Sequence, residues 1–421
     1  MTSGRIWGRI ARRNVRRNRR RTAITVGALA LGFVASTVMI GLSEGIVAQM
    51  IENGTDLLTG QIRVHGPGYE PERSLYSTLG GRAGVDLDQM LAAIGGVAGI
   101  EAVTPRVYAG GLVSSGEETA AGILMGVDPE LESSVSRILS ALEQGRLPRR
   151  REREVILGQV LADRLRAEEG SEIVLVAPAA DGSMGNDVFR VVGVFRTGAA
   201  ELDAAYVLLH IEVLQALVAL DRGRVHELAA SVDDVWSSTE VVDLLPAAIS
   251  SLDVEVAAEP WTRFRPDLAE YAQLAASFNW IIVLIVFVMA VFGVANTMLM
   301  ATWERRREFA VVRALGAPVT GIVRTVVSET MVLGVVAIAL GVAVAAPIVF
   351  WWSQAPPDLS WIVGDFTMAG ALVEANLRVE PSVKGPLLSA TGLLITVFLA
   401  GLYPAVRSAR QRPADTLAGA E

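Results

Sequence analysis

Residues 296–318 read NTMLMATWERRREFAVVRALGAP, and the fold follows from this stretch. An apolar segment ends here in a run of Arg and Glu side chains, after which Phe309, Val312 and Leu315 recur at helical spacing. A glycine and a proline then stop the helix. The pattern predicts a short amphipathic helix on a membrane surface. The simpler alternative is a loop that only keeps positive charge on one side of the membrane.

The composition on either side of this stretch is that of a membrane protein. Of the 421 residues, 52% are hydrophobic and 19% are charged, whereas soluble domains carry about 25% charged residues. Four apolar runs carry the excess, and each is long enough for the roughly 17–25 residues of a membrane-spanning helix. We expect transmembrane helices at residues 22–47, 276–303, 318–350 and 386–405.

The distribution of charge predicts an orientation. Nine arginines precede the first run, and more arginines follow the second and fourth runs. Residues 48–275 instead carry 35 Asp and Glu against 18 Arg, and the whole chain has a net charge of −8. Because basic segments stay in the cytoplasm, we expect both termini there and residues 48–275 outside. The head at residues 1–21 is then a cytoplasmic amphipathic segment, residues 351–385 form an outer loop, and residues 406–421 form a cytoplasmic tail.

Residues 48–275 show the mixed pattern of an α+β domain. Short β-like runs such as residues 121–127 alternate with helical stretches such as residues 211–219. The runs at 172–177 and 188–195 flank PAADGSMGND, which predicts a hairpin with a long tip over these ten residues. The expected fold is an α-helical membrane protein with four transmembrane helices plus a large extracytoplasmic α+β domain between the first and second.

Several kinds of chemistry are excluded. A chain without cysteine has no disulfide, thiolate metal site or cysteine nucleophile. Its three histidines, His65, His210 and His226, lie far apart, so we expect no metal site. A P-loop requires a lysine beside its glycines, and the only lysine, Lys384, falls in an outer VKGP sequence. We therefore expect no enzyme activity, no cofactor in this chain and no nucleic-acid partner.

The helix predicted within residues 304–317 suits a coupling function. Phe309 and Leu315 would enter a groove of a cytoplasmic partner, and charged side chains would surround them. The candidate coupling residues are Glu304, Arg305, Arg307, Glu308, Phe309, Val312, Arg313, Leu315 and Gly316.

Two polar residues and several small ones interrupt the apolar runs. Glu329 would be costly facing lipid, so we expect it to point into the helix bundle, with Asn296 as a candidate partner. Small side chains allow helices to approach closely. Those that we expect at helix contacts are Gly27, Gly41, Gly45, Ala337, Gly341 and Ala345.

Four segments carry a resemblance to a known family. Residues 304–316 resemble the ERxREFAxLRALGA signature after the second span of FtsX-like ABC permeases, and residues 402–417 are similar to that family's LYPAxxAAxxxPxxAL ending. Residues 60–69, GQIRVHGPGY, and residues 192–203, VGVFRTGAAELD, resemble outer stretches of the LolC and LolE lipoprotein-releasing subunits. The chain is identified as a member of the FtsX-like, MacB-type permease family, most similar to LolC and LolE.

The resemblance implies a mechanism. Two permeases, identical or paralogous, bind two separate P-loop ATPase subunits, which hold the ATP and Mg. Closure of the ATPase subunits pushes the coupling helices, and the MacB-like outer domain moves in response, so that force crosses the membrane without a channel. The expected location is the bacterial inner membrane.

Within the LolC and LolE subgroup, the resemblance implies extraction of lipoproteins. Acyl chains of the cargo would enter between the first and second spans, although plain contact with membrane lipid is equally expected there. The candidate lining residues are Phe33, Val34, Met39, Ile40, Ile285 and Met289. The predicted hairpin tip corresponds in place to a hook that grips a periplasmic carrier. Its candidate carrier-binding residues are Pro178, Asp181, Gly182 and Met184.

Two other functions stay open. One is a MacB-like exporter subunit for peptides or drugs that works with an adaptor. The other is an FtsX-like regulator of a cell-wall hydrolase that moves no substrate. The LolC-like and LolE-like outer segments favour lipoprotein release.

Overall fold

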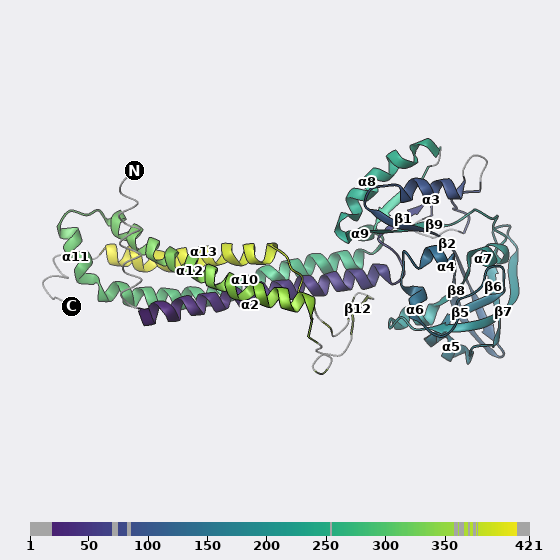
Figure 1. Cartoon of the computed structure of the whole chain (residues 1–421), viewed down its shortest axis with the longest axis horizontal. Coiled ribbons are helices and arrows are strands. Elements are labelled where there is room, and N and C mark those ends of the chain that lie inside the picture. Colours follow the sequence, from purple (N-terminus) through teal and green to yellow (C-terminus); the bar gives the residue numbers. More distant parts are fainter. Residues whose placement is uncertain are drawn as a thin grey trace. The chain divides into compact units, whose positions relative to one another are not determined.

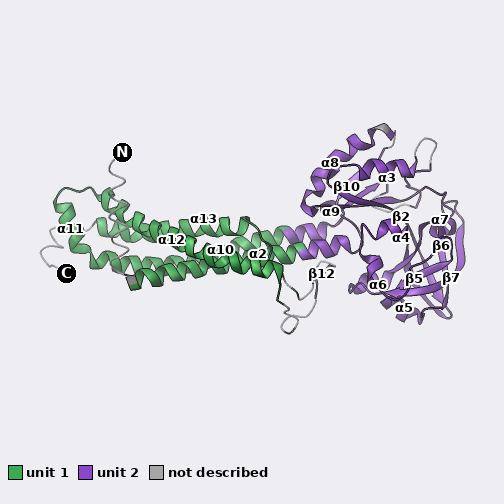
Figure 2. Cartoon of the chain, in the orientation of Figure 1, with its two compact units in different colours: residues 1–48, 273–363, 375–421 green, residues 49–272, 364–374 purple. Residues whose placement is uncertain are grey.

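The computed structural model describes residues 19–69, 75–81, 86–252, 255–357, 361, 366–368, 371–373, 376 and 378–410. The chain forms two compact units (Figure 2). Unit 1 comprises residues 1–48, 273–363 and 375–421, and unit 2 comprises residues 49–272 and 364–374. The expected cytoplasmic head lies almost wholly outside the described residues, and so does the tail beyond Arg410.

Unit 1 is helical (Figure 1). Its elements are α2 (Arg19–Asp56), α10 (Pro266–Glu304), α11 (Arg306–Ala314), α12 (Val319–Gln354) and α13 (Lys384–Ala409), of which α2 and α10 also contribute residues to unit 2. Four of these helices are long and apolar enough to cross a membrane. With 39 residues, α10 is one continuous helix about 58 Å long, roughly twice the thickness of a bilayer's hydrocarbon core.

Glycines set the helix spacing in unit 1. A Cβ atom on Gly341 of α12 would lie 2.5 Å from Cδ1 of Phe33 on α2. A Cβ atom on Gly401 of α13 would lie 2.4 Å from Oγ1 of Thr330 on α12. Both distances are shorter than atoms tolerate, so only glycine allows these helices to approach so closely.

The other small residues expected at helix contacts divide into two groups. Ala337 and Ala345 are buried, and a Cβ atom on Gly45 would lie 1.9 Å from the carbonyl oxygen of Arg378. Gly27 is different, because no atom would lie within 4 Å of its Cβ position. The predicted close contact at Gly27 is therefore wrong within this chain.

Unit 2 is built on one ten-stranded sheet, ordered β10-β1-β9-β2-β3-β8-β5-β7-β4, in which β6 pairs with both β2 and β7. The strands are β1 (Ile62–His65), β2 (Ile100–Ser115), β3 (Glu118–Val127), β4 (Leu142–Gly145), β5 (Glu154–Gly158), β6 (Glu172–Pro178), β7 (Met184–Phe195), β8 (Tyr206–His210), β9 (Glu227–Val232) and β10 (Ala257–Pro260). The pairs β2–β3–β8–β5–β7–β6–β2 close a ring, which removes most open strand edges. A separate hairpin pairs β11 (Phe366–Met368) with β12 (Ala371–Val373).

Short helices connect these strands and confirm the α+β prediction. They are α3 (Leu87–Gly95), α4 (Pro129–Glu132), α5 (Gln159–Leu165), α6 (Ala200–Ala205), α7 (Ile211–Leu217), α8 (Ser238–Ile249), α9 (Trp261–Phe264) and the 3₁₀ turns Ile138–Ala141, Val235–Ser237 and Ser250–Leu252. Alternate residues of the ring strands enter two different apolar clusters. Val207 and Leu209 lie in the larger cluster and Leu208 in the smaller one, and all three are buried. Because side chains alternate between the faces of a strand, the ring is packed on both faces.

The longest strand, β2, was missed by the sequence analysis. It contains Pro105, Gly110 and Gly111, which all lower strand propensity. A Cβ atom on Gly111 would lie 2.5 Å from the carbonyl oxygen of Val176 on β6. Glycine is needed here because the ring closes at this contact, and local propensity carries no signal for it.

The predicted hairpin is present, but its ten-residue tip is wrong. β6 and β7 stay paired up to Pro178 and Met184, which leaves only residues 179–183 as the loop. Two of the four candidate carrier-binding residues, Pro178 and Met184, are therefore strand residues, while Asp181 and Gly182 lie in the loop. Polar and small residues hid the strand ends, because ladder pairing overrides their weak propensity.

Candidate coupling site and buried charges

Helix α11 begins and ends for local reasons. Arg305 leaves helical geometry between α10 and α11, and Gly316 adopts φ +94°, a left-handed conformation that favours glycine. Pro318 then caps α12 in extended geometry. The predicted short surface helix is thus a separate element between two long ones.

Arg305 fixes the start of α11. Its Nη1 donates to Oε2 of Glu329 on α12 at 3.0 Å, and its Nε donates to Oε2 of Glu308 at 3.2 Å. Its guanidinium also lies 5.0 Å from the ring centre of Phe309, within the range of a cation–π contact. One side chain therefore joins the first turn of α11 to α12.

Arg313 fixes the other end of α11. Its Nη1 donates at 2.9 Å to the carbonyl oxygen of Ala409, the last residue of α13. This is the C-terminal end of a helix, where unpaired carbonyls favour a positive charge. Because α11 is bonded to both α12 and α13, displacement of α11 must displace those helices or break these bonds.

The buried face of α11 corrects one expectation. Phe309 and Ala310 are only 7% and 5% exposed, and they pack in the apolar cluster of unit 1. Phe309 therefore serves the chain's own core and is not a side chain for a partner's groove. Leu315 is 83% exposed and remains a candidate for that function.

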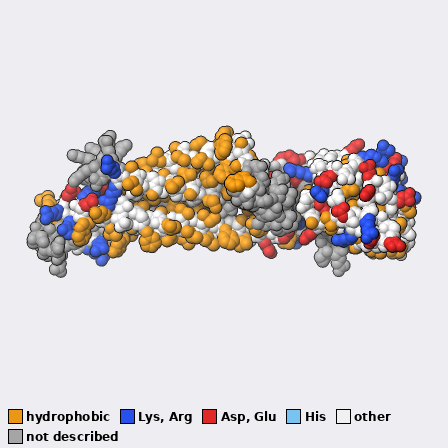
Figure 3. Space-filling view, turned by 90° about the horizontal axis from the view of Figure 1, so that it is seen from below, with side chains coloured by type: hydrophobic (Ala, Val, Ile, Leu, Met, Phe, Trp, Pro, Cys, Tyr) orange, Lys and Arg blue, Asp and Glu red, His pale blue; other side chains and the backbone are white. Residues whose placement is uncertain are grey.

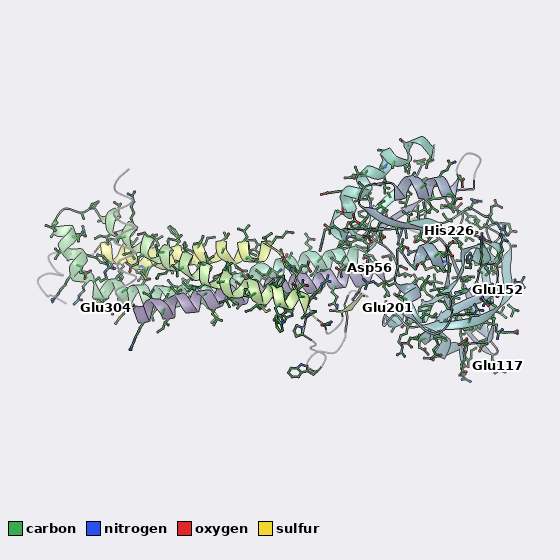
Figure 4. The ribbon with its side chains drawn as sticks, in the orientation of Figure 1. Asp56, Glu117, Glu152, Glu201, His226 and Glu304 are labelled. Carbon is green, nitrogen blue, oxygen red and sulfur yellow. The ribbon has the colours of Figure 1, made fainter. Side chains whose placement is uncertain are left out.

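The outward face of α11 is apolar with basic neighbours. Val311, Val312 and Leu315 are exposed there, and Arg307 is exposed on the same short helix. Glu304, labelled in Figure 4, ends α10 and pairs with Arg21 of α2 at 3.3 Å. Lys and Arg side chains gather at this end of unit 1, whereas hydrophobic side chains cover its middle (Figure 3).

The two intramembrane polar residues do not meet. Glu329 pairs with Arg305, so its expected inward orientation agrees with the structure. Asn296 is exposed on α10 and is not the partner that the structure gives Glu329. The sequence could not reveal this pair, because Arg305 lies 24 positions earlier and outside the apolar run.

The six candidate acyl-lining residues also differ in exposure. Phe33 and Ile40 are buried inside unit 1, at 0% and 1% exposure, so their predicted position facing lipid or cargo is wrong. Met39, Ile285 and Met289 are exposed, and Val34 is half-buried. Helical spacing identified a face of the helix but not which face packs inward.

Unit 2 contains a buried charge cluster that the sequence analysis missed. Arg106 binds Glu132 through two hydrogen bonds, Nη2 to Oε1 at 2.6 Å and Nε to Oε2 at 3.0 Å, and both side chains are fully buried. Glu227 lies 3.5 Å from Nη1 of Arg106 and 3.3 Å from Nε of Arg63. The available signal was an arginine within an apolar strand, such as Arg63 between Ile62 and Val64.

Tyr108 and His226 complete this cluster. Burial raises the pKa of the Tyr108 hydroxyl, and the Glu227 carboxylate raises it further, so the hydroxyl stays protonated and donates to Glu227 Oε1 at 2.8 Å. Burial lowers the pKa of His226, whose neutral Nδ1 accepts from the Tyr108 N–H at 2.9 Å. His226 is labelled in Figure 4. Burial disfavours the charge on Arg106, but Glu132, Tyr108 and Glu227 together outweigh this and raise its pKa.

The cluster holds the segment that follows α2. Nη1 of Arg106 donates to the carbonyl oxygen of Thr59 at 3.2 Å. Arg265, directly before α10, donates from Nη1 to the carbonyl oxygen of Gly54 on α2 at 2.9 Å. Within unit 2, Arg265 thus bonds the residue before α10 to the last turn of α2, and Arg106 of β2 bonds the segment that follows α2.

The buried charged groups around Arg106 have a structural function. Among the residues that the structure describes, no group of three or more His, Asp or Glu side chains is arranged to hold a metal ion. The buried carboxylates of Glu132 and Glu227 face arginines.

Comparisons with known proteins identify the family. Residues 22–248 match the family model of the MacB-like periplasmic core domain, and residues 280–413 match the FtsX-like permease C-terminal model. The lipoprotein-releasing system transmembrane protein LolC of Neisseria meningitidis serogroup B is 23% identical over 416 residues, covering 94% of this chain and 93% of that protein. The corresponding LolE of Haemophilus influenzae is 22% identical over 325 residues, covering 76% of this chain and 77% of that protein.

A solved structure is also similar. It is the periplasmic region of MacB from Actinobacillus actinomycetemcomitans, which is 14% identical, with a TM-score of 0.35, and covers 51% of this chain and 94% of that one. The first family model matches more than half of the chain, and the second matches most of the remainder, including α11, α12 and α13. The chain therefore belongs to the ABC transporter permeases of the MacB, FtsX and LolC/LolE family.

Proposed function

We propose that this chain is the permease subunit of a lipoprotein-releasing ABC transporter. It converts ATP hydrolysis by a separate ATPase subunit into motion of the α+β unit, and this motion extracts lipoproteins from the bacterial inner membrane. The names of the relatives that align with most of the chain support this cargo. The absence of a P-loop lysine in the sequence supports a separate subunit as the site of ATP and Mg binding.

The exposed face of α11 is the observation that carries this proposal. An ATPase subunit docks on Val311, Val312 and Leu315. Because Arg305 and Arg313 bond α11 to α12 and α13, a push on this face is transmitted to the long helices. A loosely tethered loop would instead absorb the displacement.

The continuous helices supply the rest of the path. α10 runs without a break from Pro266 to Glu304, so its two ends move together more readily than two jointed helices would. Within unit 2, the contact between Arg265 and Gly54 and the ion pair between Arg137 and Asp56 bind both helix ends to the α+β fold. Force applied through α2 and α10 therefore acts on the whole unit.

The assembly that follows from this function has several parts. We infer two ATPase subunits and a second permease, identical or paralogous, with both termini of this chain in the cytoplasm. Membrane lipid surrounds the apolar surface of unit 1, and lipoprotein is the cargo. A periplasmic carrier is the receiver of the released cargo.

The docking function can be tested by substitution. Leu315→Asp should reduce recovery of the ATPase subunit with the tagged chain by about tenfold or more, because a charge enters an apolar contact. Leu131→Asp is the matched control, since Leu131 is an exposed leucine of unit 2 that is 40% exposed. Equal ATPase recovery with both variants would sink the proposed docking face.

The cargo needs a separate measurement. Mass spectrometry of what co-purifies with the chain from its native membrane should recover acylated lipoproteins together with a P-loop ATPase. Recovery of an adaptor would favour peptide or drug export, and recovery of a cell-wall hydrolase would favour hydrolase regulation. Either result without lipoprotein overturns the proposed cargo while leaving ATPase docking intact.

A further inference from the structure

Unit 1 has a half-open cavity of about 310 Å³ between α2, α12 and the first residues of α13. Its walls are mostly apolar and include Phe33, Val349 and Phe350. Its polar lining residues are Thr37, Glu44, Glu380 and Ser382, of which Glu380 and Ser382 act on Glu44. The cavity is therefore amphipathic, with an apolar body and a polar end.

Two polar atoms at this cavity are buried without a hydrogen-bond partner among the described residues. They are Oγ1 of Thr37, a residue only 3% exposed, and Oε2 of Glu44. An unpaired buried hydroxyl or carboxylate oxygen costs free energy that a hydrogen-bond donor in the cavity would recover. Both residues line the cavity, so the occupant that they favour carries N–H or O–H groups.

A fixed segment of backbone closes the cavity against α2. The N–H of Glu380 donates to the carbonyl oxygen of Gly41 at 2.9 Å. A Cβ atom on Gly41 would lie 2.7 Å from Cγ1 of Val379, and Gly45 meets the backbone of Arg378 still more closely. The two glycines that the sequence singled out thus admit this segment, and the cavity is a built feature of the unit.

The cavity lies among residues typical of the boundary between the hydrocarbon core of a bilayer and water. It is formed near the end of α12, where Phe350 and Trp351 are 68% and 62% exposed, and beside Lys384, which begins α13. Aromatic side chains collect at the boundary between hydrocarbon and water, and lysine ends reach toward the headgroups. An amphiphile of the bilayer can therefore place its polar end beside Glu44.

The charges select the kind of headgroup. Glu44 offers a carboxylate, and Lys384 and Glu380 are near enough to act on it electrostatically. We propose that this cavity binds a phospholipid with a primary ammonium headgroup, such as phosphatidylethanolamine. The ammonium donates to Glu44, the phosphate faces Lys384, and the start of an acyl chain lies against Phe33 and Val349.

This inference goes beyond the proposed function and is independent of it. Phosphatidylethanolamine is a component of the membrane itself and is not moved with the cargo. It stabilises the contact of the 378–386 segment with α2 and α12. The site differs from the exposed surface of α2 and α10 at which acyl chains of cargo are expected.

The test counts lipids on the full-length protein. The purified chain is placed in nanodiscs that contain equal amounts of phosphatidylethanolamine, phosphatidylcholine and phosphatidylglycerol, then released and analysed by native mass spectrometry. We expect phosphatidylethanolamine to be retained about tenfold more than either other lipid, since a charge-assisted hydrogen bond to a buried carboxylate provides that preference. Equal retention of the three lipids would overturn the proposal.

Three variants distinguish recognition of the headgroup from binding of lipid in the cavity as a whole. Glu44→Gln should abolish the preference for phosphatidylethanolamine, and Glu52→Gln, on the same helix but outside the cavity lining, should keep it. Ala346→Leu, which fills the cavity, should reduce retention of all three lipids. If Ala346→Leu acts but Glu44→Gln does not, the cavity binds acyl chains alone and the headgroup assignment is wrong.

A second readout, which does not depend on mass spectrometry, checks the same preference. Adding phosphatidylethanolamine to the detergent-solubilised chain should raise its melting temperature, and this rise should be absent in Glu44→Gln but present in Glu52→Gln. If Glu44→Gln instead changes only the oligomeric state, with lipid retention unaltered, a second copy covers the cavity and the proposal fails.

Discussion

The two units of this protein differ in which large apolar side chains they expose and in what they bury. In unit 1, glycines and alanines lie at close helix contacts beside buried large side chains such as Phe287, while Met289 and Phe292 are 72% exposed. In unit 2, the core is Leu, Ile, Val and Phe, and it also encloses the fully buried Arg106–Glu132 pair. A surrounding lipid phase removes the hydrophobic gain of burying large side chains, so close backbone packing decides unit 1. In unit 2, burial of large apolar side chains removes them from water, so the hydrophobic gain stabilises that unit.

The largest effect should come from breaking the charge cluster of unit 2. Arg106→Met leaves the carboxylate of Glu132 buried without its arginine, while Glu227 keeps Arg63, and the loss costs about 3–5 kcal/mol of unfolding free energy. Urea unfolding of the full chain, followed by protease sensitivity of unit 2, measures it. Arg166→Met removes an exposed arginine and should change stability by about 0.5 kcal/mol or less. A small effect of Arg106→Met would mean that the cluster is dispensable.

One substitution should have opposite signs at two positions of α2. Gly45→Ala forces a Cβ atom against the carbonyl oxygen of Arg378 and should destabilise the chain by about 1–3 kcal/mol. Gly27→Ala meets no atom within 4 Å and should be neutral or stabilising, by up to about 1 kcal/mol from helix propensity. Thermal melting of both variants in the same detergent compares them. Equal destabilisation would show that Gly27 packs on a second chain.

The pH dependence of the stability of unit 2 should show the contribution of His226. Its pKa is lowered by burial in the folded state, so the unfolded state binds more protons as pH falls below about 6.5. The contribution of His226 to stability is therefore full above that pH and is lost at lower pH. Replacement by asparagine, which keeps an acceptor for the Tyr108 N–H, should reduce the stability loss between pH 7.5 and 5.5. An unchanged loss would assign the effect to carboxylates.

The smallest stability effect should arise at the end of unit 1. Glu329→Gln weakens its contact with Arg305, which keeps Glu308, so the cost should be about 1 kcal/mol or less. ATP-dependent cargo release should decrease more than stability does, because α11 then moves without α12. ATP-dependent cargo release by the reconstituted complex, measured beside Glu308→Gln, checks this. Normal release by the Glu329 variant would contradict transmission through this ion pair.

Local signals sufficed for much of the fold. Apolar length identified the four long helices, and the period of residues 309–315 identified α11. Strand β2 escaped because Pro105 and two glycines mask a strand whose pairing partners lie far away in the chain. The hairpin tip was too long in the prediction because ladder pairing extends into polar residues.

In the candidate coupling site too, the sequence predicted some features, and only the structure shows the others. Sequence spacing placed Phe309 and Leu315 on one helix but could not tell that Phe309 packs inward and Leu315 outward. It placed Glu329 in an apolar run but assigned it Asn296 instead of Arg305.

The sequence by itself determined the membrane segments, the surface helix and the family, because helix periodicity, hydropathy and short motifs are properties of neighbouring residues. Only the tertiary structure decided the Arg106 cluster, the partner of Glu329 and the cavity beside Glu44. Each of these joins residues from distant parts of the chain. Their energies depend on burial and on distances of a few ångströms, which spacing along the sequence does not encode.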